Sequence, residues 1–148
     1  MIQSFRRIKI DPNDALYSKI IRHGKIRCER CLCVRDLQCA HIMPRGHHRT
    51  RYMLKPYKNA VALCCDCHNW FDTHRDDTPI FEVDARRFYS PLKNAYTFLV
   101  FRCGYTWLDL HNLYALAHHG TSKYGVIEKT EVGRQLKEVW KQINKESV

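Results

Sequence analysis

Two cysteine pairs, each with two residues between its members, constrain this chain more than any other feature. Cys28 and Cys31 form the first pair, and Cys64 and Cys67 form the second. A CxxC turn lets two sulfur atoms reach one ion, and four thiolates complete a closed tetrahedral zinc site. The N-terminal segment lacks the apolar stretch of a signal peptide, so disulfide bonds are the less favoured alternative. The spacing therefore predicts one structural Zn²⁺ bound by these four cysteines.

The predicted zinc site has a consequence for stability. Structural zinc contributes roughly 10–16 kcal/mol in small domains, which matches or exceeds the ~5–15 kcal/mol net stability of a typical domain. We therefore expect loss of zinc to unfold the surrounding region. The remaining cysteines are expected to be free thiols in the interior: Cys33, Cys39, Cys65 and Cys103.

The positive charge of the chain is concentrated in its first part. The 148 residues are enough for about one domain, and their formal net charge is +10. Residues 1–58 contain 14 Lys and Arg but only four Asp and Glu, whereas the rest carries 11 of each sign. Such polarity predicts contact with a phosphate backbone, and a solvated charged surface is the alternative. No apolar run approaches the roughly 20 residues of a membrane span, so we expect a soluble cytoplasmic protein. The charge polarity predicts that it binds nucleic acid.

Helices are predicted at both ends of the chain. Residues 11–24 combine an N-cap aspartate, Asp11, with Pro12 at the first helical position and Gly24 at the end. A short helix is expected from Cys67 to about His74, before Pro79. Amphipathic periodicity predicts two more helices, over 107–120 with Gly120 as its cap and over 131–145.

Short apolar runs predict the strands. The runs are "LQCAHI" at 37–42, "NAVAL" at 59–63 and "YTFLVF" at 96–101, and a long basic loop separates the first two. Together the elements predict a single α+β domain. Its parts are a small zinc-stabilised core over 28–75, an N-terminal helical flank over 1–27 and a C-terminal packing extension over 79–148.

Three motifs in the predicted core carry a resemblance to a known family. "CERC", "AHIMPR" and "NAVALCCDCH", in this order and spacing, resemble zinc-stapled phage-type members of the HNH endonuclease family. The likeness covers residues 28 to about 74, roughly a third of the chain. It implies a ββα-metal core in which a hairpin carries the first histidine, a loop the asparagine and a helix the last histidine. It also implies metal-dependent hydrolysis of DNA to 5′-phosphate ends, by a phage-encoded protein acting in the host cytoplasm.

The resemblance assigns a role to each motif residue. Hydrolysis of a phosphodiester needs a base, a cation and donors that hold the phosphate. His41 corresponds to the general base, because a neutral imidazole accepts a proton near neutral pH. Asn59 corresponds to the residue that orients the base, and His68 to a ligand of the catalytic ion, Mg²⁺ or another divalent metal such as Mn²⁺ or Ni²⁺. Asp72 follows His68 by one helical turn and is a candidate second ligand.

One position departs from the family pattern. Family members commonly carry Asp or His immediately before the base, as a metal ligand, and this chain has Ala40. Asp72, His74, His47 or His48 are candidates to replace that ligand. An inactive descendant of the nuclease is the alternative.

The basic loop "PRGHHRTRYMLKPYK" supplies candidate phosphate contacts. Guanidinium groups bind phosphate oxygens in pairs, so we assign DNA contacts to Arg45, Arg49 and Arg51. The segment contains no recognisable base-reading helix. Two of the site residues have a structural alternative. His41 could be a histidine with a structural role only, and His68 could be a neighbour of the zinc site that binds no second metal.

Three functions compete on this evidence. The first is a metal-dependent HNH endonuclease. The second is a catalytically inactive zinc-stapled DNA-binding or assembly module, and the third is a structural zinc protein that does not bind nucleic acid. One HNH unit has a single active site, so cutting both strands requires two successive nicks or a homodimer, and a phage protein partner is also open.

Overall fold

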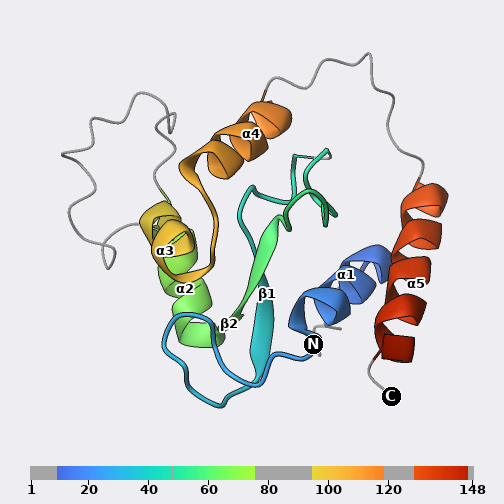
Figure 1. Cartoon of the computed structure of the whole chain (residues 1–148), viewed down its shortest axis with the longest axis horizontal. Coiled ribbons are helices and arrows are strands. Elements are labelled where there is room, and N and C mark those ends of the chain that lie inside the picture. Colours follow the sequence, from blue (N-terminus) through green and yellow to red (C-terminus); the bar gives the residue numbers. More distant parts are fainter. Residues whose placement is uncertain (1–9, 48, 76–94, 119–128, 147–148) are drawn as a thin grey trace, which may run out of the picture.

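The structure, a computed structural model, describes residues 10–47, 49–75, 95–118 and 129–146. These residues form an α+β fold with five helices and one two-stranded antiparallel sheet, as predicted (Figure 1). In chain order the elements are α1 (Pro12–Arg22), β1 (Leu37–His41), β2 (Ala60–Cys64), α2 (Cys65–Thr73), α3 (Ala95–Arg102), α4 (Trp107–His118) and α5 (Lys129–Glu146).

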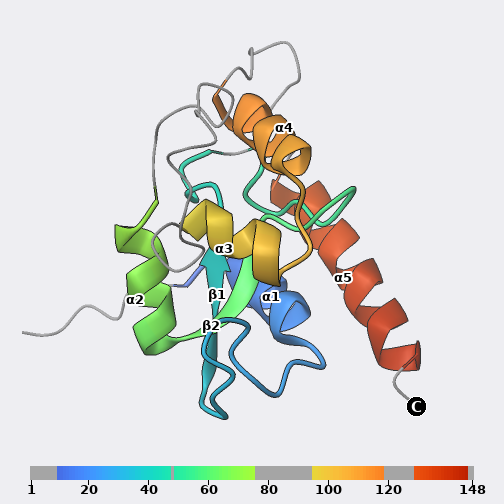
Figure 2. The same ribbon diagram turned by 60° about the vertical axis from the view of Figure 1, so that its left-hand side comes forward.

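The hairpin of β1 and β2 is the centre of the fold. Its register pairs Leu37 with Cys64 and His41 with Ala60, so both strands agree with the predicted runs to within a residue. Helix α2 follows β2 without a linker and starts at Cys65, two residues earlier than predicted. Helices α1 and α2 lie on opposite sides of the hairpin (Figures 1 and 2).

The hairpin separates two hydrophobic clusters, which explains why every residue of β2 is buried. Val61 and Leu63 belong to the cluster formed with α2, α3 and α4. Ala60 and Ala62 belong to the cluster formed with α1 and α5. Successive side chains of a strand point to opposite faces, so the alternation along β2 assigns its large residues to one cluster and its small residues to the other.

Helix α1 forms as the sequence predicts and packs against α5. Asp11 caps it by accepting a hydrogen bond from the Asn13 amide at 2.9 Å. The Asn13 side chain then donates to the Lys129 carbonyl at 3.0 Å. Gly133 permits this approach, because a Cβ there would lie 2.9 Å from Asn13 Oδ1. A glycine inside a helix costs about 1 kcal/mol relative to alanine, and here it has a packing reason.

The predicted strand at 96–101 is wrong. The segment is helix α3, and its residues Ala95 to Leu99 are all buried. A short apolar run buried all round has no periodicity that distinguishes a strand from a helix, and packing among α2, α4 and the hairpin decides in favour of the helix.

The two later helices agree with prediction. Helix α4 buries Leu110 and Leu113, and α5 packs Leu136 and Trp140 against α1 and β2. The predicted helix signals at Pro79 and Gly120 lie outside the described residues. Among the helices of the described part, none has the length and apolarity needed to cross a membrane.

Candidate metal centre and catalytic cleft

The four predicted zinc ligands come together. The Sγ atoms of Cys28, Cys31, Cys64 and Cys67 all lie within 4.8 Å of one another. The Cys31 and Cys64 sulfurs are 3.8 Å apart, which is about the edge of a tetrahedron with Zn–S distances near 2.3 Å. The first pair comes from a loop, and the second comes from the end of β2 and the first turn of α2. The geometry and the thiol donor set are compatible with one structural zinc ion.

Backbone hydrogen bonds shape the first cysteine turn. The Leu32 amide donates to the Cys28 carbonyl and the Cys28 amide to the Cys33 carbonyl, each at 3.0 Å. Leu32 has a φ of 63°, a left-handed conformation that costs a non-glycine residue about 1–2 kcal/mol. Glu29 fastens this turn to β2, since its carboxylate accepts from the Ala62 amide at 2.7 Å and its amide donates to the Ala62 carbonyl at 3.1 Å.

The cluster is electrostatically suited to a cation. Burial raises the pKa of the Cys67 thiol to about 12, so a nearby positive charge is needed to hold it as a thiolate at neutral pH. Arg30 donates to Cys67 Sγ at 3.5 Å, and its guanidinium lies over the Trp70 ring at 3.7 Å. A divalent metal would supply the remaining charge.

The other cysteines follow the prediction only in part. Cys39 and Cys103 are half-buried thiols, and burial raises the pKa of each to about 12. Cys65 is exposed, so its expected burial is wrong, because it begins α2 on the solvent side of the helix. Cys33 borders the metal cluster, with its sulfur 3.1 Å from Cys31 Sγ.

His41 lies at the end of β1 and is held from two directions. Its ring stacks on Tyr17 of α1, with centroids 5.4 Å apart and an interplanar angle of 27°. Its Nε2 lies 3.1 Å from the Arg51 carbonyl oxygen. A carbonyl can only accept, so Nε2 carries the hydrogen and Nδ1 keeps a lone pair. Burial lowers the pKa of His41 to about 4, and the ring is therefore neutral at pH 7 and able to accept a proton.

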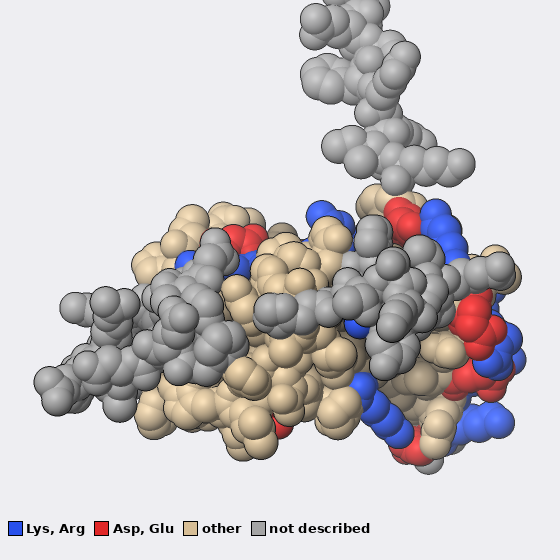
Figure 3. Space-filling model, turned by 90° about the horizontal axis from the view of Figure 1, so that it is seen from above, with Lys and Arg blue, Asp and Glu red and all other residues tan. Residues whose placement is uncertain are grey.

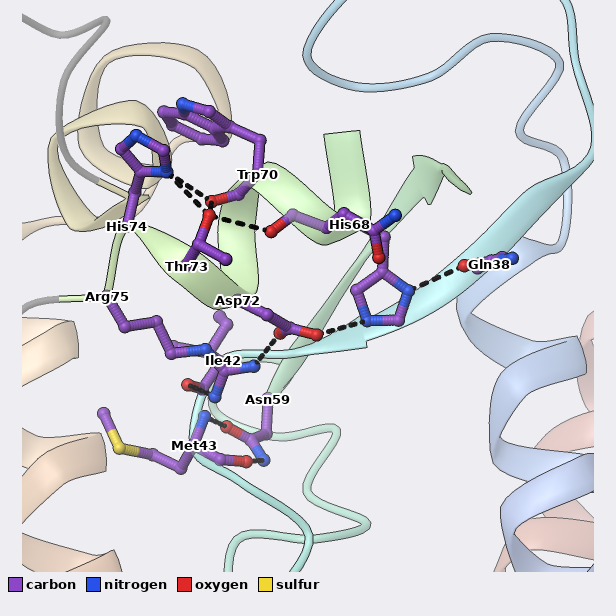
Figure 4. A network of polar contacts seen from close by, with 11 residues as sticks. Gln38, Ile42, Met43, Asn59, His68, Trp70, Asp72, Thr73, His74 and Arg75 are labelled. Carbon is purple, nitrogen blue, oxygen red and sulfur yellow. Dashed lines mark hydrogen bonds and ion pairs between the residues drawn. The ribbon is translucent and has the colours of Figure 1, made fainter. Parts of the chain in front are cut away.

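Asn59 fastens the segment that follows His41. It is fully buried, its Oδ1 accepts from the Met43 amide at 2.8 Å and its Nδ2 donates to the Met43 carbonyl at 3.1 Å (Figure 4). Its backbone carbonyl also accepts from the Ile42 amide at 2.8 Å. Because both ends of the amide are occupied, Asn59 is built to position the chain beside His41.

His68 and Asp72 face each other on α2 (Figure 4). His68 Nδ1 lies 2.8 Å from Gln38 Oε1 on β1, and His68 Nε2 lies 3.4 Å from Asp72 Oδ2. With Nδ1–H donating to Gln38, the Nε2 lone pair points toward a carboxylate oxygen. A protonated His68 would instead donate Nε2–H to this oxygen. Imidazole nitrogen and carboxylate oxygen are also ligand types that divalent metals accept.

Arg75 joins this pair to the end of β1. Its guanidinium donates to Asp72 Oδ1 through Nη2 and to the Ile42 carbonyl through Nη1, at 3.0 Å in the second case. The side chain is only 14% exposed, and within the described residues its Nε has no hydrogen-bond partner. Sequence reasoning missed Arg75, which lies two residues after the end of α2 and therefore outside the helical spacing that relates His68 to Asp72.

A cleft of about 860 Å³ brings these side chains together. The lining residues that bear on function come from three elements and one loop: Asp14, Ser18, Lys19 and Arg22 of α1, Gln38 and His41 of β1, Arg45 of the loop, and His68, Asp72 and Arg75 at α2. The predicted base and both predicted metal ligands thus share one cleft, and Asn59 is buried away from it. Gln38 was missed because its role depends on a contact across 30 residues.

The predicted DNA contacts separate into different environments. Arg45 is exposed on the cleft. Arg51 is held by Asp14 of α1 through two bonds, Nε to Oδ1 at 3.1 Å and Nη2 to Oδ2 at 2.6 Å. Its guanidinium therefore fastens α1 to the loop, which disfavours the predicted phosphate contact. Arg49 is half-buried and is not among the residues that line the cleft.

His47 and His74, two of the histidines proposed as replacement ligands, are not among the residues that line the cleft. The His47 ring contacts the His118 ring, with centroids 4.5 Å apart. His74 stacks on Trp70 and contacts its carbonyl oxygen through Nδ1 at 2.8 Å. His48 lies outside the described residues. Of the candidates within the described part, Asp72 is the one beside His68.

No known protein-family model matches the chain, and no curated protein or solved structure matches it either. The features of the chain that bear on function are the cysteine cluster, the neutral His41, the pair of His68 and Asp72, and the basic residues around the cleft.

Proposed function

We propose that this chain is a metal-dependent endonuclease of the HNH type, with a ββα-metal core, that hydrolyses phosphodiester bonds in DNA. The observation that carries the proposal is the shared cleft, in which a neutral histidine and a histidine–carboxylate pair approach from neighbouring elements. This combination suits activation of water beside a bound cation.

His41 is the general base of the proposed reaction. Its Nδ1 accepts the proton of the attacking water, while the Arg51 carbonyl keeps the hydrogen on Nε2. The Tyr17 ring fixes the plane of the imidazole. Asn59 acts on the backbone next to the base and transfers no proton.

His68 and Asp72 are the residues that would hold the catalytic divalent ion, Mg²⁺, Mn²⁺ or Ni²⁺. When bound, such an ion stabilises negative charge on the phosphate and on the leaving oxygen. Asp72 stands in for the ligand that is missing at Ala40. The cysteine cluster, proposed to hold structural zinc, fixes the first turn of α2 and therefore His68, which directly follows Cys67.

A nicking assay tests the proposal. Zinc-loaded wild type and His41→Ala would be incubated with supercoiled plasmid in Mg²⁺, Mn²⁺ or Ni²⁺, with EDTA as the control. We expect cutting by wild type alone, and only with a divalent ion. Absence of cutting by wild type in all three metals would overturn the proposal.

A second function is favoured by one feature of the site. Ala40 offers no ligand, and Asp72 already pairs with Arg75, so the catalytic ion has fewer free donors than the family pattern implies. The corresponding function is a catalytically inactive zinc-stapled DNA-binding or assembly module. Salt-sensitive DNA binding that is equal in wild type and His41→Ala, without cleavage, would identify it.

A further inference from the structure

Helix α1 forms one wall of the cleft that holds the residues proposed to act on the phosphate. Lys19 and Arg22 of α1 line the same cleft as His41, His68 and Asp72. The wall has a fixed position because Asp14 is bound by Arg51 and because Tyr17 stacks on His41 and donates to the Met53 carbonyl at 2.8 Å. These contacts set the distance between α1 and the base.

The uncompensated charges of the cleft are positive. Its two carboxylates are already neutralised, Asp14 by Arg51 and Asp72 by Arg75. Lys19 and Arg22 are exposed, and within the described part of the chain neither forms an ion pair. Arg22 is braced along the helix, since its Nε lies 3.1 Å from Ser18 Oγ and 3.2 Å from the Ser18 carbonyl.

We infer that α1 is a DNA-binding wall, in which Lys19 and Arg22 contact backbone phosphates of the strand whose scissile bond lies at His41. The inference rests on the proposed function and extends it to an element outside the predicted core. It also replaces Arg51, which sequence reasoning assigned to phosphate, with residues of the N-terminal flank. Phosphate contacts of this kind give affinity and register without reading sequence.

Helix α5 provides the contrast and the control. In the view from above, basic and acidic side chains are intermingled at the right-hand end of the molecule, the side on which α5 lies in Figure 1 (Figure 3). Arg134 pairs with Glu131, and Lys141 pairs with Glu138. Lys137 and Lys145 are exposed on α5, and the cleft has no lining residue from that helix. Substituting them removes two charges without touching the cleft.

The salt dependence of DNA binding tests the inference. Binding of zinc-loaded protein to a labelled duplex would be measured from 50 to 300 mM NaCl, without other divalent ions so that no strand is cut. Log K falls as log salt rises, and each lost phosphate contact reduces the steepness of that fall by about 0.9. The double variant Lys19→Gln/Arg22→Gln should therefore reduce the magnitude of the slope by about 1.8 and weaken binding about tenfold at moderate salt. Lys137→Gln/Lys145→Gln should leave the slope unchanged.

Charge-preserving variants separate contact from folding. Lys19→Arg/Arg22→Lys should keep the wild-type slope, and circular dichroism should show an unchanged melting temperature for every variant compared. Equal slopes for the cleft and α5 variants would overturn the inference even if wild type nicks plasmid. A wild-type protein that binds no DNA would overturn both the inference and the proposed function.

Discussion

The cysteine cluster and the cleft beside His41 are built on the same hairpin and helix, yet they differ in how far they are closed. The cluster gathers four sulfur atoms within 4.8 Å, and three of its four residues are buried. The cleft is open, and its residues come from three elements and a loop. A closed site holds a metal for stability, whereas an open site leaves room for substrate. The two regions should therefore respond differently to substitution.

The sharpest test of this difference is removal of one metal ligand. Cys64→Ser should lose bound zinc and the cooperative unfolding transition, because structural zinc contributes roughly 10–16 kcal/mol. Zinc content by mass spectrometry and thermal melting by circular dichroism would measure this. The neighbouring Cys65→Ser is the matched control, since Cys65 is exposed and outside the cluster. Equal melting temperatures for the two variants would show that the cluster is not a stabilising centre.

Substitution in the cleft should affect activity far more than folding. His41→Ala should lower the nicking rate by about 10²–10⁴, the usual contribution of a general base. His74→Ala is the control, because His74 stacks on Trp70 and does not line the cleft. Rates would be compared under single-turnover conditions with Mg²⁺. A similar loss of rate in His41→Ala and His74→Ala would show that His41 is not the general base.

A smaller effect is expected at the proposed metal ligand. Asp72→Asn removes the carboxylate charge and should raise the Mn²⁺ concentration for half-maximal nicking about tenfold, while near-maximal rate returns at high Mn²⁺. Asp66→Asn is the control on the same helix, since Asp66 pairs with Arg35 away from the cleft. An unchanged Mn²⁺ requirement in Asp72→Asn would exclude this carboxylate as a ligand.

The smallest expected effect is that of pH on the nicking rate. Burial lowers the pKa of His41 to about 4, so the base is already unprotonated at pH 5 and nicking should not change between pH 5.5 and 7.5 through this group. Half-maximal activity near pH 6.5, the ordinary value for histidine, would contradict this expectation. Rates would be measured at constant ionic strength.

The same shift also predicts a change in folding stability. The unfolded chain binds a proton at His41 below pH about 6.5, whereas the folded chain binds it only below about 4. Stability should therefore fall as the pH is lowered through this window, and the fall should be smaller in His41→Gln. Urea unfolding at pH 7 and pH 5 would compare wild type with the variant.

Local signals in the sequence predicted the parts of the fold that local chemistry determines. The Asp11 cap and Pro12 start α1 as expected, and the CxxC spacing brings the four cysteines together. The apolar run at 96–101 was wrongly predicted as a strand, because a buried strand and a short buried helix can have the same apolar composition. Elements with a cap or a ligand spacing were therefore predictable, and a bare apolar run was not.

The candidate site was predictable to the extent that its residues lie within one motif. His68 and Asp72 share a helix face, so their pairing followed from spacing alone. Gln38 and Arg75 act through contacts with residues about 30 positions away, and such contacts leave no local pattern. For the same reason the sequence did not indicate the ion pair of Arg51 with Asp14 of α1, and the assignment of Arg51 to DNA stays a prediction.

The contact between α1 and α5 means that the packing of α1 is completed late in synthesis. Asn13 bonds to Lys129 across 116 positions, and Gly133 admits that contact. During translation the hairpin and cysteine cluster are complete long before α5 emerges, while α1 still lacks the helix that covers its outer face. The contacts of α1 with His41, Arg51 and Met53 can form before α5 is made, whereas the face of α1 that packs on α5 is covered only when the last helix has been made. A nascent chain should therefore contain the cysteine cluster and the cleft well before the second hydrophobic cluster is complete.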